Sequence, residues 1–367
     1  AVPSPKRQLL NYLHSRRTLL VLDGFEHLLD GAGLVSEMLH AGPGVKILVT
    51  SRVRLGVQGE YLHLVSPLEV PDTAGVAPLD VDRVRRCSAV DLFTTSVRRV
   101  QPGFEAAGNE LRHVARICRL VQGIPLAILL AAKWTETLSV RLIAAQIAER
   151  SVDFLHADWP DVPERQRGMR AVLDQSWNLL GERQRETLAE LSVFHGSFTE
   201  EAARRVVGAS QQALASLTRR SLLSRVFAPV GAGPASPAPD ALAGLSTGGG
   251  RYAMHEILRQ YAAERLARRS EATYESRRRH ADYYVRFLRR WLADAKGPHQ
   301  VAALRRMDSD IDDARGAWDW LVAQEDVTGI RRAVDGLCWF YRRRARNQEA
   351  VTACRMAVDR LRILVDR

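Results

Sequence analysis

The stretch RRTLLVLDGFEHLL, residues 16–29, decides how the first part of the chain folds. It contains a short apolar run that ends on Asp23 and Gly24, and Glu26 follows three residues after the aspartate. A continuous apolar run of this length is typical of a strand buried within a parallel sheet. The stretch therefore predicts a buried strand that carries a carboxylate to the edge of a sheet.

A second apolar run, KILVT at residues 46–50, is followed by Ser51 and Arg52. The residues between the two runs have helical spacing, with one apolar face made of Leu34, Val35, Met38 and Leu39. Strand, helix and strand at this spacing predict a βαβ unit with a parallel sheet. Because ligands bind beyond the carboxyl ends of parallel strands, we expect Asp23 and Arg52 to face the same crevice. The run YLHLV at residues 61–65 predicts a third strand.

The polar residues at this edge suit a metal–phosphate site. An aspartate placed there commonly holds Mg²⁺, Glu26 is close enough to orient an attacking water, and Arg52 is placed to meet a γ-phosphate. Each residue also has a plainer interpretation: Asp23 simply ends a strand, Glu26 is a first-turn acid favoured by the helix dipole, and Arg52 is a solvated loop arginine. An apolar run that ends on aspartate does not decide between them.

The chain is almost entirely helical from about residue 82. Apolar residues recur at helical spacing over residues 110–121, and Gly123 marks the end of that helix. A very apolar helix begins next, with Pro125 in its first turn, where proline is tolerated. We expect a helical bundle over residues 81–165, after a partial α/β domain at residues 1–80.

Residues 166–270 have a different rhythm. Short helices, two of them capped by Thr199 and Ser210, precede two short strands at residues 222–227 and 251–254. Helices followed by a β-hairpin indicate a winged-helix domain. The tip of that hairpin, residues 228–250, is rich in proline, glycine and alanine, so we expect it to be disordered.

Residues 271–367 are helical again, with a break near residues 344–348. Two apolar faces are predicted, one made of Ile311, Ala314, Trp318 and Leu321, the other of Val351, Cys354, Val358 and Leu361. Helix pairs of this kind indicate tetratricopeptide-like repeats. Cysteines 118, 338 and 354 lie in apolar helical patterns, which predicts buried reduced thiols and a cytoplasmic location. No apolar run reaches the roughly 20 residues of a membrane helix, so we expect no membrane partner.

Several segments occur in one order along the chain: LLVLDGFEHLL, KILVTSR, GIPLAI at residues 123–128 and RYAMHEILRQYAAERL at residues 251–266. Together they resemble the STAND ATPases (signal-transduction ATPases with numerous domains), in the NB-ARC-like branch found in bacterial AfsR- and LuxR-type transcriptional regulators. Residues 308–326 are similar to the start of the tetratricopeptide-like sensor region of these proteins. The resemblance covers nearly the whole chain.

The resemblance implies ATP or ADP and Mg²⁺ as ligands. Asp23 would end the Walker B strand and bind Mg²⁺, and Arg52 would be the sensor after the next strand. Gly123 and Pro125 match the turn that packs against adenine and ribose. His255 matches the histidine that contacts the β-phosphate of ADP and holds the inactive state.

The chain departs from the family pattern in three ways. Gly24 stands where the family usually has Asn or Asp, and Glu256 stands in place of an aspartate. The phosphate-loop pattern G-x-x-x-x-G-K-[ST] does not occur, so the cradle for the phosphates is missing. We expect a truncated or degenerate P-loop NTPase-like sheet that binds nucleotide weakly and hydrolyses it negligibly.

The predicted protein is thus mainly α-helical with a partial α/β parallel sheet. The first functional interpretation is a nucleotide-dependent regulatory switch whose helical repeats sense a small signal or a protein, with DNA bound through a separate domain and oligomerisation set by nucleotide. The alternative is a DNA-binding protein that acts through its winged helix. Residues 251–300 hold 12 Arg and Lys against six Asp and Glu, and the net charge of +11 suits an acidic partner. The basic residues are, however, interspersed with acids along the helices, as on an ordinary solvated surface.

Overall fold

The computed structural model describes residues 4–71, 80–157, 167–226, 250–298 and 300–365. Its residues form two compact units, the first made of 1–66 with 215–223 and the second of 67–214 with 224–367. Helices dominate the second unit, and each sheet is small. The predicted disordered tip lies outside the described residues, apart from residue 250. Across the described ranges, no helix combines the length and the apolar character that crossing a membrane requires.

The first unit contains the predicted βαβ arrangement. Strands β1 (Thr18–Leu22) and β2 (Val45–Val49) pair in parallel, with Leu20 opposite Ile47. Helix α2 (Ala32–Ala41) connects them after two short 3₁₀ turns, η1 (Phe25–His27) and η2 (Leu29–Gly31). Helix α1 (Pro5–His14) precedes the sheet, and Ser4 caps it through its side chain.

One face of this sheet is covered and the other is not. The inward side chains pack on buried residues of both helices, and they are Leu20, Leu22, Ile47 and Val49. On the opposite face Leu19, Val21 and Leu48 are 62%, 60% and 56% exposed. The prediction of a fully buried strand is therefore wrong: α1 and α2 supply apolar side chains to one face alone.

Two further expectations for this unit are also wrong. Residues 61–65 form no strand, and Tyr61, Leu64 and Val65 are 99%, 77% and 88% exposed. A strand needs a neighbour for its backbone groups, and the two described strands of this unit pair with each other alone. Leu39 is exposed on α2, whereas Val35 and Met38 are buried as predicted.

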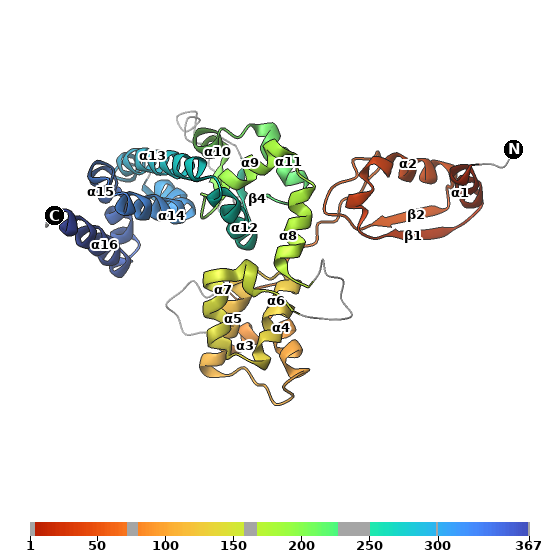
Figure 1. The fold of residues 1–367 in the computed structure, drawn as a ribbon, viewed down its shortest axis with the longest axis horizontal. Coiled ribbons are helices and arrows are strands. Elements are labelled where there is room, and N and C mark those ends of the chain that lie inside the picture. The colour runs from red at the N-terminus through yellow and green to blue at the C-terminus, as the bar shows by residue number, and fades with distance from the viewer. Residues whose placement is uncertain (1–3, 72–79, 158–166, 227–249, 299, 366–367) are drawn as a thin grey trace. The chain divides into compact units, whose positions relative to one another are not determined.

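The second unit begins with the predicted helices of the bundle region. Its elements are α3 (Val81–Arg86), α4 (Ser88–Arg98), α5 (Gly108–Leu120), α6 (Pro125–Lys133), η3 (Trp134–Glu136) and α7 (Val140–Phe154). Helix α4 packs on α5 and α6, and α5 packs on α7 (Figure 1). Leu111, Val114 and Cys118 of α5 are fully or almost fully buried, as their helical spacing predicts.

Four short helices and a three-stranded antiparallel sheet follow. The helices are α8 (Met169–Asn178), α9 (Glu182–Leu191), α10 (Glu200–Val207) and α11 (Gln211–Arg219). The sheet has the order β3 (Phe198–Thr199), β5 (Arg251–Ala253), β4 (Ser224–Val226). Thr199 accepts from the Ala202 N–H at 3.1 Å and Ser210 from the Ala213 N–H at 3.2 Å, which confirms both predicted caps.

The last helices are α12 (Glu256–Ala267), α13 (Ser270–Ala295), α14 (Gln300–Ala323), α15 (Val327–Arg343) and α16 (Asn347–Val365). From α13 onward each helix packs on the next, and α13 and α14 lie alongside one another (Figure 1). The predicted face of α14 is buried throughout. That of α16 is not, since Val351 and Val358 are 54% and 47% exposed. Cys338 and Cys354 are half-buried, not buried as predicted.

A polar network joins β5 to α14 inside the second unit. The Arg251 guanidinium donates to both oxygens of Asp310, at 2.8 Å from Nη2 to Oδ1 and 3.3 Å from Nη1 to Oδ2. Its Nε donates to the Ser197 hydroxyl at 2.9 Å, and Nη2 also donates to the carbonyls of Ser197 and Ser309. Asp310 is 5% exposed, and burial raises the pKa of its carboxyl although Arg251 opposes that shift.

Replacing Arg251 by methionine should destabilise the second unit strongly, because Asp310 would stay buried without a cation. Breaking a buried pair costs about 3–5 kcal/mol, and the 19% exposure of the Arg251 side chain places the effect near 3 kcal/mol. Urea unfolding followed by tryptophan fluorescence measures it, since all six tryptophans of the described residues belong to this unit. The matched control is Arg205→Met. Its pair with Glu201 is 59% and 45% exposed, so equal losses for the two variants would contradict the prediction.

Candidate functional site

The carboxyl ends of β1 and β2 bring Asp23 and Thr50 together, as the parallel sheet predicts. The Thr50 hydroxyl donates to Asp23 Oδ1 at 2.5 Å and accepts from the Gly24 N–H at 3.0 Å. Gly24 has φ +66°, a left-handed conformation that glycine adopts without a Cβ penalty. Thr50 thus holds the turn after β1 and orients the exposed Asp23 carboxylate at the sheet edge.

Glu26 and Arg52 lie in the same part of the first unit and face each other. Arg52 Nε is 3.6 Å from Glu26 Oε1, with the Glu26 side chain 8% exposed and that of Arg52 38% exposed. The second oxygen of Glu26 is buried and has no hydrogen-bond partner among the described residues. A buried carboxylate with one unsatisfied oxygen can accept a proton or a water, which is the chemistry that the sequence predicts for Glu26. The roles of Asp23, Glu26 and Arg52 in nucleotide chemistry stay predictions.

Thr50→Val should loosen the turn at the sheet edge, because it removes a donor to Asp23 and an acceptor for Gly24 while keeping the side-chain shape. One such hydrogen bond is worth about 1 kcal/mol, or roughly a fivefold change in local opening. Amide hydrogen exchange of residues 22–27 should accelerate by about that factor. Thr50→Ser, which keeps the hydroxyl, serves as the control. Unchanged exchange in the valine variant would show that the hydroxyl does not hold the turn.

In the second unit the predicted turn at Gly123 and Pro125 is present. Gly123 has φ +72°, and a Cβ there would lie 2.2 Å from the Leu68 carbonyl oxygen. The Leu68 N–H also donates to the Gly123 carbonyl at 3.0 Å, and Pro125 is the first residue of α6. This glycine is therefore required by the close approach of the segment at Leu68, whatever the turn binds.

His255 caps α12, where its Nδ1 accepts from the Ile257 N–H at 3.2 Å. Nδ1 therefore carries no proton and Nε2 does, in the neutral ring. Nε2 is buried and lacks a hydrogen-bond partner among the described residues; the Val121 carbonyl is near enough to affect the pKa but does not reach hydrogen-bond geometry. Burial lowers the pKa of His255 to about 4, against opposition from the Glu256 carboxylate.

An N–H donor left unsatisfied in this way is costly unless it meets an acceptor. It lies at the N-terminus of a helix, where orphan backbone donors and the helix dipole favour anions. Glu256 N–H is itself joined to Gln122 Oε1 at 3.3 Å, so the cap of α12 touches the segment that leads into Gly123. The resemblance placed His255 and Gly123 at one nucleotide site, and the structure places their segments in contact.

The low pKa of His255 predicts that acid destabilises the folded second unit. The unfolded ring titrates near its ordinary value of 6.5 and the folded ring near 4, so the unfolded state binds more protons between these values. Stability should be complete above pH 6.5 and fall as pH decreases toward 4, by up to about 3 kcal/mol. The variant His255→Asn keeps a capping side chain without the titration. Urea unfolding across this range should show a shallower loss for the variant, and identical pH profiles would contradict the assignment.

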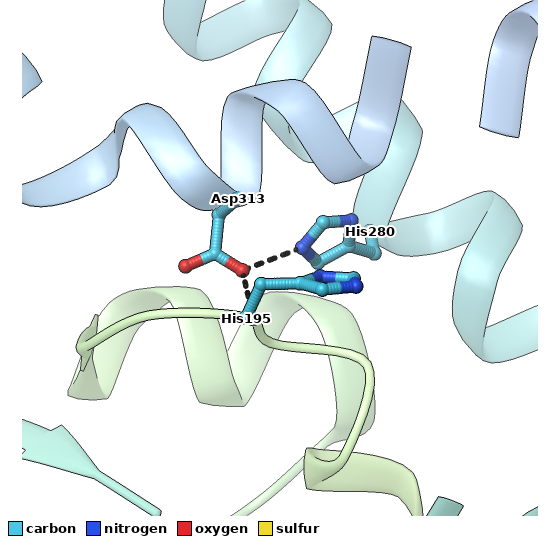
Figure 2. A group of neighbouring side chains, drawn as sticks. All are labelled: His195, His280 and Asp313. Carbon is cyan, nitrogen blue, oxygen red and sulfur yellow. Dashed lines mark hydrogen bonds and ion pairs between the residues drawn. The ribbon is translucent and has the colours of Figure 1, made fainter. Parts of the chain in front are cut away.

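One cluster of polar side chains was not predicted from the sequence (Figure 2). His195 in the segment after α9, His280 on α13 and Asp313 on α14 meet, with their ligating atoms within 4.8 Å of one another. His280 and Asp313 are 3% and 0% exposed. The signal available was a polar side chain on an apolar helical face: His280 lies one turn before buried Tyr284, and Asp313 one turn before buried Ala317.

The RRRH run at residues 277–280 suggested phosphate contacts, but most of its side chains form ion pairs within the protein. Arg278 pairs with Glu275 at 2.9 Å and with Asp282 at 3.6 Å, and Arg279 pairs with Glu275 at 3.1 Å. His280 is buried against Asp313. Of the four side chains, only that of Arg277 has no ion pair among the described residues.

No family model matches the chain. It is 32% identical over 337 residues to proteins of Mycobacterium tuberculosis and Mycobacterium bovis that are provisionally described as HTH-type transcriptional regulators. The aligned region covers 91% of this chain and 35% of each relative, so the chain spans about a third of their length. An uncharacterized Mycobacterium tuberculosis protein is 34% identical over 205 residues, or 56% of this chain and 48% of that protein.

Among solved structures, the chain aligns with a STAND protein of Pyrococcus horikoshii that has a tetratricopeptide repeat sensor. The alignment covers 96% of this chain and 45% of that protein, with 14% identity and a TM-score of 0.24.

Proposed function

We propose that this chain is a regulatory module of the STAND type, which changes state with bound nucleotide and forms part of a transcriptional regulator. Two kinds of support come from the sequence. The ordered segments around Asp23, Arg52, Gly123 and His255 resemble the nucleotide-switch modules of such regulators. Relatives described as transcriptional regulators align with 91% of the chain.

The single observation that carries the nucleotide part is the free Nε2–H of His255. Its ring is fixed by the cap of α12, neutral at pH 7, and presents a buried donor that has no hydrogen-bond acceptor in the part of the chain that the structure describes. A phosphate oxygen supplies the acceptor that this donor lacks, and the helix N-terminus adds a favourable field. The residues present therefore fit the diphosphate of ADP in this part of the site.

The remaining chemistry limits what the chain can do with nucleotide. When bound, Mg²⁺ would neutralise phosphate charge, and Asp23 is the carboxylate that would hold it. The sequence contains no phosphate loop, whose backbone N–H groups and lysine supply most of the contacts to the phosphates. We therefore propose weak binding, negligible hydrolysis and a role as a switch, not as an ATPase.

The alternative of direct DNA binding through the basic helices receives less support. Specific and nonspecific DNA affinity depends on cationic side chains that are free to meet phosphates. Two of the three arginines of the RRRH run share exposed ion pairs with Glu275, which reduces the net positive charge of this run. A salt-dependent shift of random duplex DNA at physiological ionic strength would nevertheless favour the alternative.

Titration of the chain with fluorescent ADP tests the proposal. We expect saturable binding with a dissociation constant above about 10 μM, and His255→Asn should weaken it about tenfold, since a hydrogen bond to a charged group contributes about 1.5 kcal/mol or more. His63→Asn, a change of an exposed histidine outside the site, should leave binding unchanged.

Phosphate release from Mg-ATP is measured alongside. Steady turnover or sub-micromolar affinity would contradict the weak-switch proposal. Equal ADP affinity of the wild type and His255→Asn would remove the role proposed for His255.

A further inference from the structure

Among the described residues, the buried carboxylate of Asp313 has no ion pair with an arginine or a lysine. Its Oδ1 accepts from the His195 backbone N–H at 2.7 Å and lies 3.0 Å from His280 Nε2 (Figure 2). Its Oδ2 is buried and has no partner among the described residues. Burying a carboxylate in this way is expensive unless a cation compensates it.

The nearby arginines are committed to other carboxylates. Arg251 pairs with Asp310 at 2.8 Å, and Arg259 pairs with Glu256 at 2.6 Å. Each of these pairs is close to neutral. Among the described residues, neither arginine forms an ion pair with Asp313.

The side chains around Asp313 are metal ligands by type and by spacing. Three elements contribute one ligating atom each: His195 from the segment between α9 and β3, His280 from α13, and Asp313 from α14. These atoms lie within 4.8 Å of one another. In a tetrahedral site with metal–ligand bonds near 2.0 Å, ligand atoms lie roughly 3.3 Å apart. The distance of 3.0 Å between His280 Nε2 and Asp313 Oδ1 is already close to that separation.

The third ligand is free to close the site. His195 is exposed, so its ring can move by the small distance that remains and provides an entry path from solvent. The ring lies over Gly316 of α14: a Cβ there would be 2.7 Å from His195 Nδ1, so a larger residue would push the ring out of its observed position. The backbone N–H of His195 also orients the Asp313 carboxylate, as a supporting hydrogen bond does in metal sites.

We propose that His195, His280 and Asp313 bind one divalent transition-metal ion of the zinc class, with water completing the coordination. Two imidazoles and a carboxylate are borderline donors that suit Zn²⁺ and its neighbours better than Mg²⁺ or Ca²⁺. The ion would tie the segment after α9 to α13 and α14. This site is independent of the proposed nucleotide function, because none of its ligands belongs to the segments that resemble a nucleotide switch.

A second pair of possible metal ligands must be removed before zinc binding at the Asp313 cluster can be measured. The sulfurs of Cys338 and Cys354 lie 3.5 Å apart on α15 and α16, and thiols bind zinc readily. The test therefore uses the untagged full chain with both cysteines changed to serine. Chelator-treated protein is titrated with Zn²⁺ by calorimetry, and with Co²⁺ to record the absorption spectrum.

We expect one ion per chain in the doubly substituted protein, and visible Co²⁺ bands without a thiolate charge-transfer band. His195→Ala should weaken Zn²⁺ binding at least tenfold, because it removes one of three ligands, while circular dichroism stays unchanged at this exposed position. Asp313→Asn tests the carboxylate in the same way. His63→Ala is the matched control and should bind as the parent does.

The proposal is overturned if the doubly substituted chain takes up no Zn²⁺. It is also overturned if His195→Ala binds Zn²⁺ as tightly as its parent. Neither result would alter the ADP titration of the nucleotide proposal, so the two proposals succeed or fail separately.

Discussion

The ion pair between Arg251 and Asp310 is the constraint on which the C-terminal part of the second unit depends. Its guanidinium comes from β5, and it binds the carboxylate and a carbonyl of α14 as well as the segment that leads into β3. A charge can be buried here only because each donor and acceptor finds a partner in one geometry. The pair consequently fixes how the small sheet meets the long helices, a task that nondirectional apolar packing cannot perform.

Asp313 is a second carboxylate that the same helix buries, and its charge is less well compensated. Asp310 and Asp313 are three residues apart, so both lie on the inward face of α14. Arg251 satisfies the first, whereas in the described ranges the second has hydrogen bonds on Oδ1 but none on Oδ2. The packing of this junction therefore includes a buried carboxylate that is only partly satisfied. For the same reason, a bound cation or a change in these groups would act on the packing of α13 against α14.

The elements of this fold can be inferred from local patterns, and their environments cannot. Periodicity predicted the parallel strands and most helices close to their observed positions. The caps at Thr199 and Ser210 could also be predicted, because capping is a contact within one helical turn. The exposure of the Leu19 and Val21 side chains could not be predicted from the sequence. An apolar run states that a strand is suited to burial, but which elements cover each face is settled by the whole chain.

The candidate sites show the same difference between what local sequence patterns predict and what only the packed chain determines. Parallel pairing guaranteed that Asp23 and Thr50 would meet at one sheet edge, so sequence alone could find that pair. The buried state of His255 depends on where α12 packs, and the partners of Asp313 come from segments 118 and 33 residues away. A polar residue in the middle of an apolar helical face is nevertheless informative by itself. Burial without a partner is costly, so such a residue indicates either a partner elsewhere in the chain or an atom that is still unsatisfied, and the three-dimensional structure shows which.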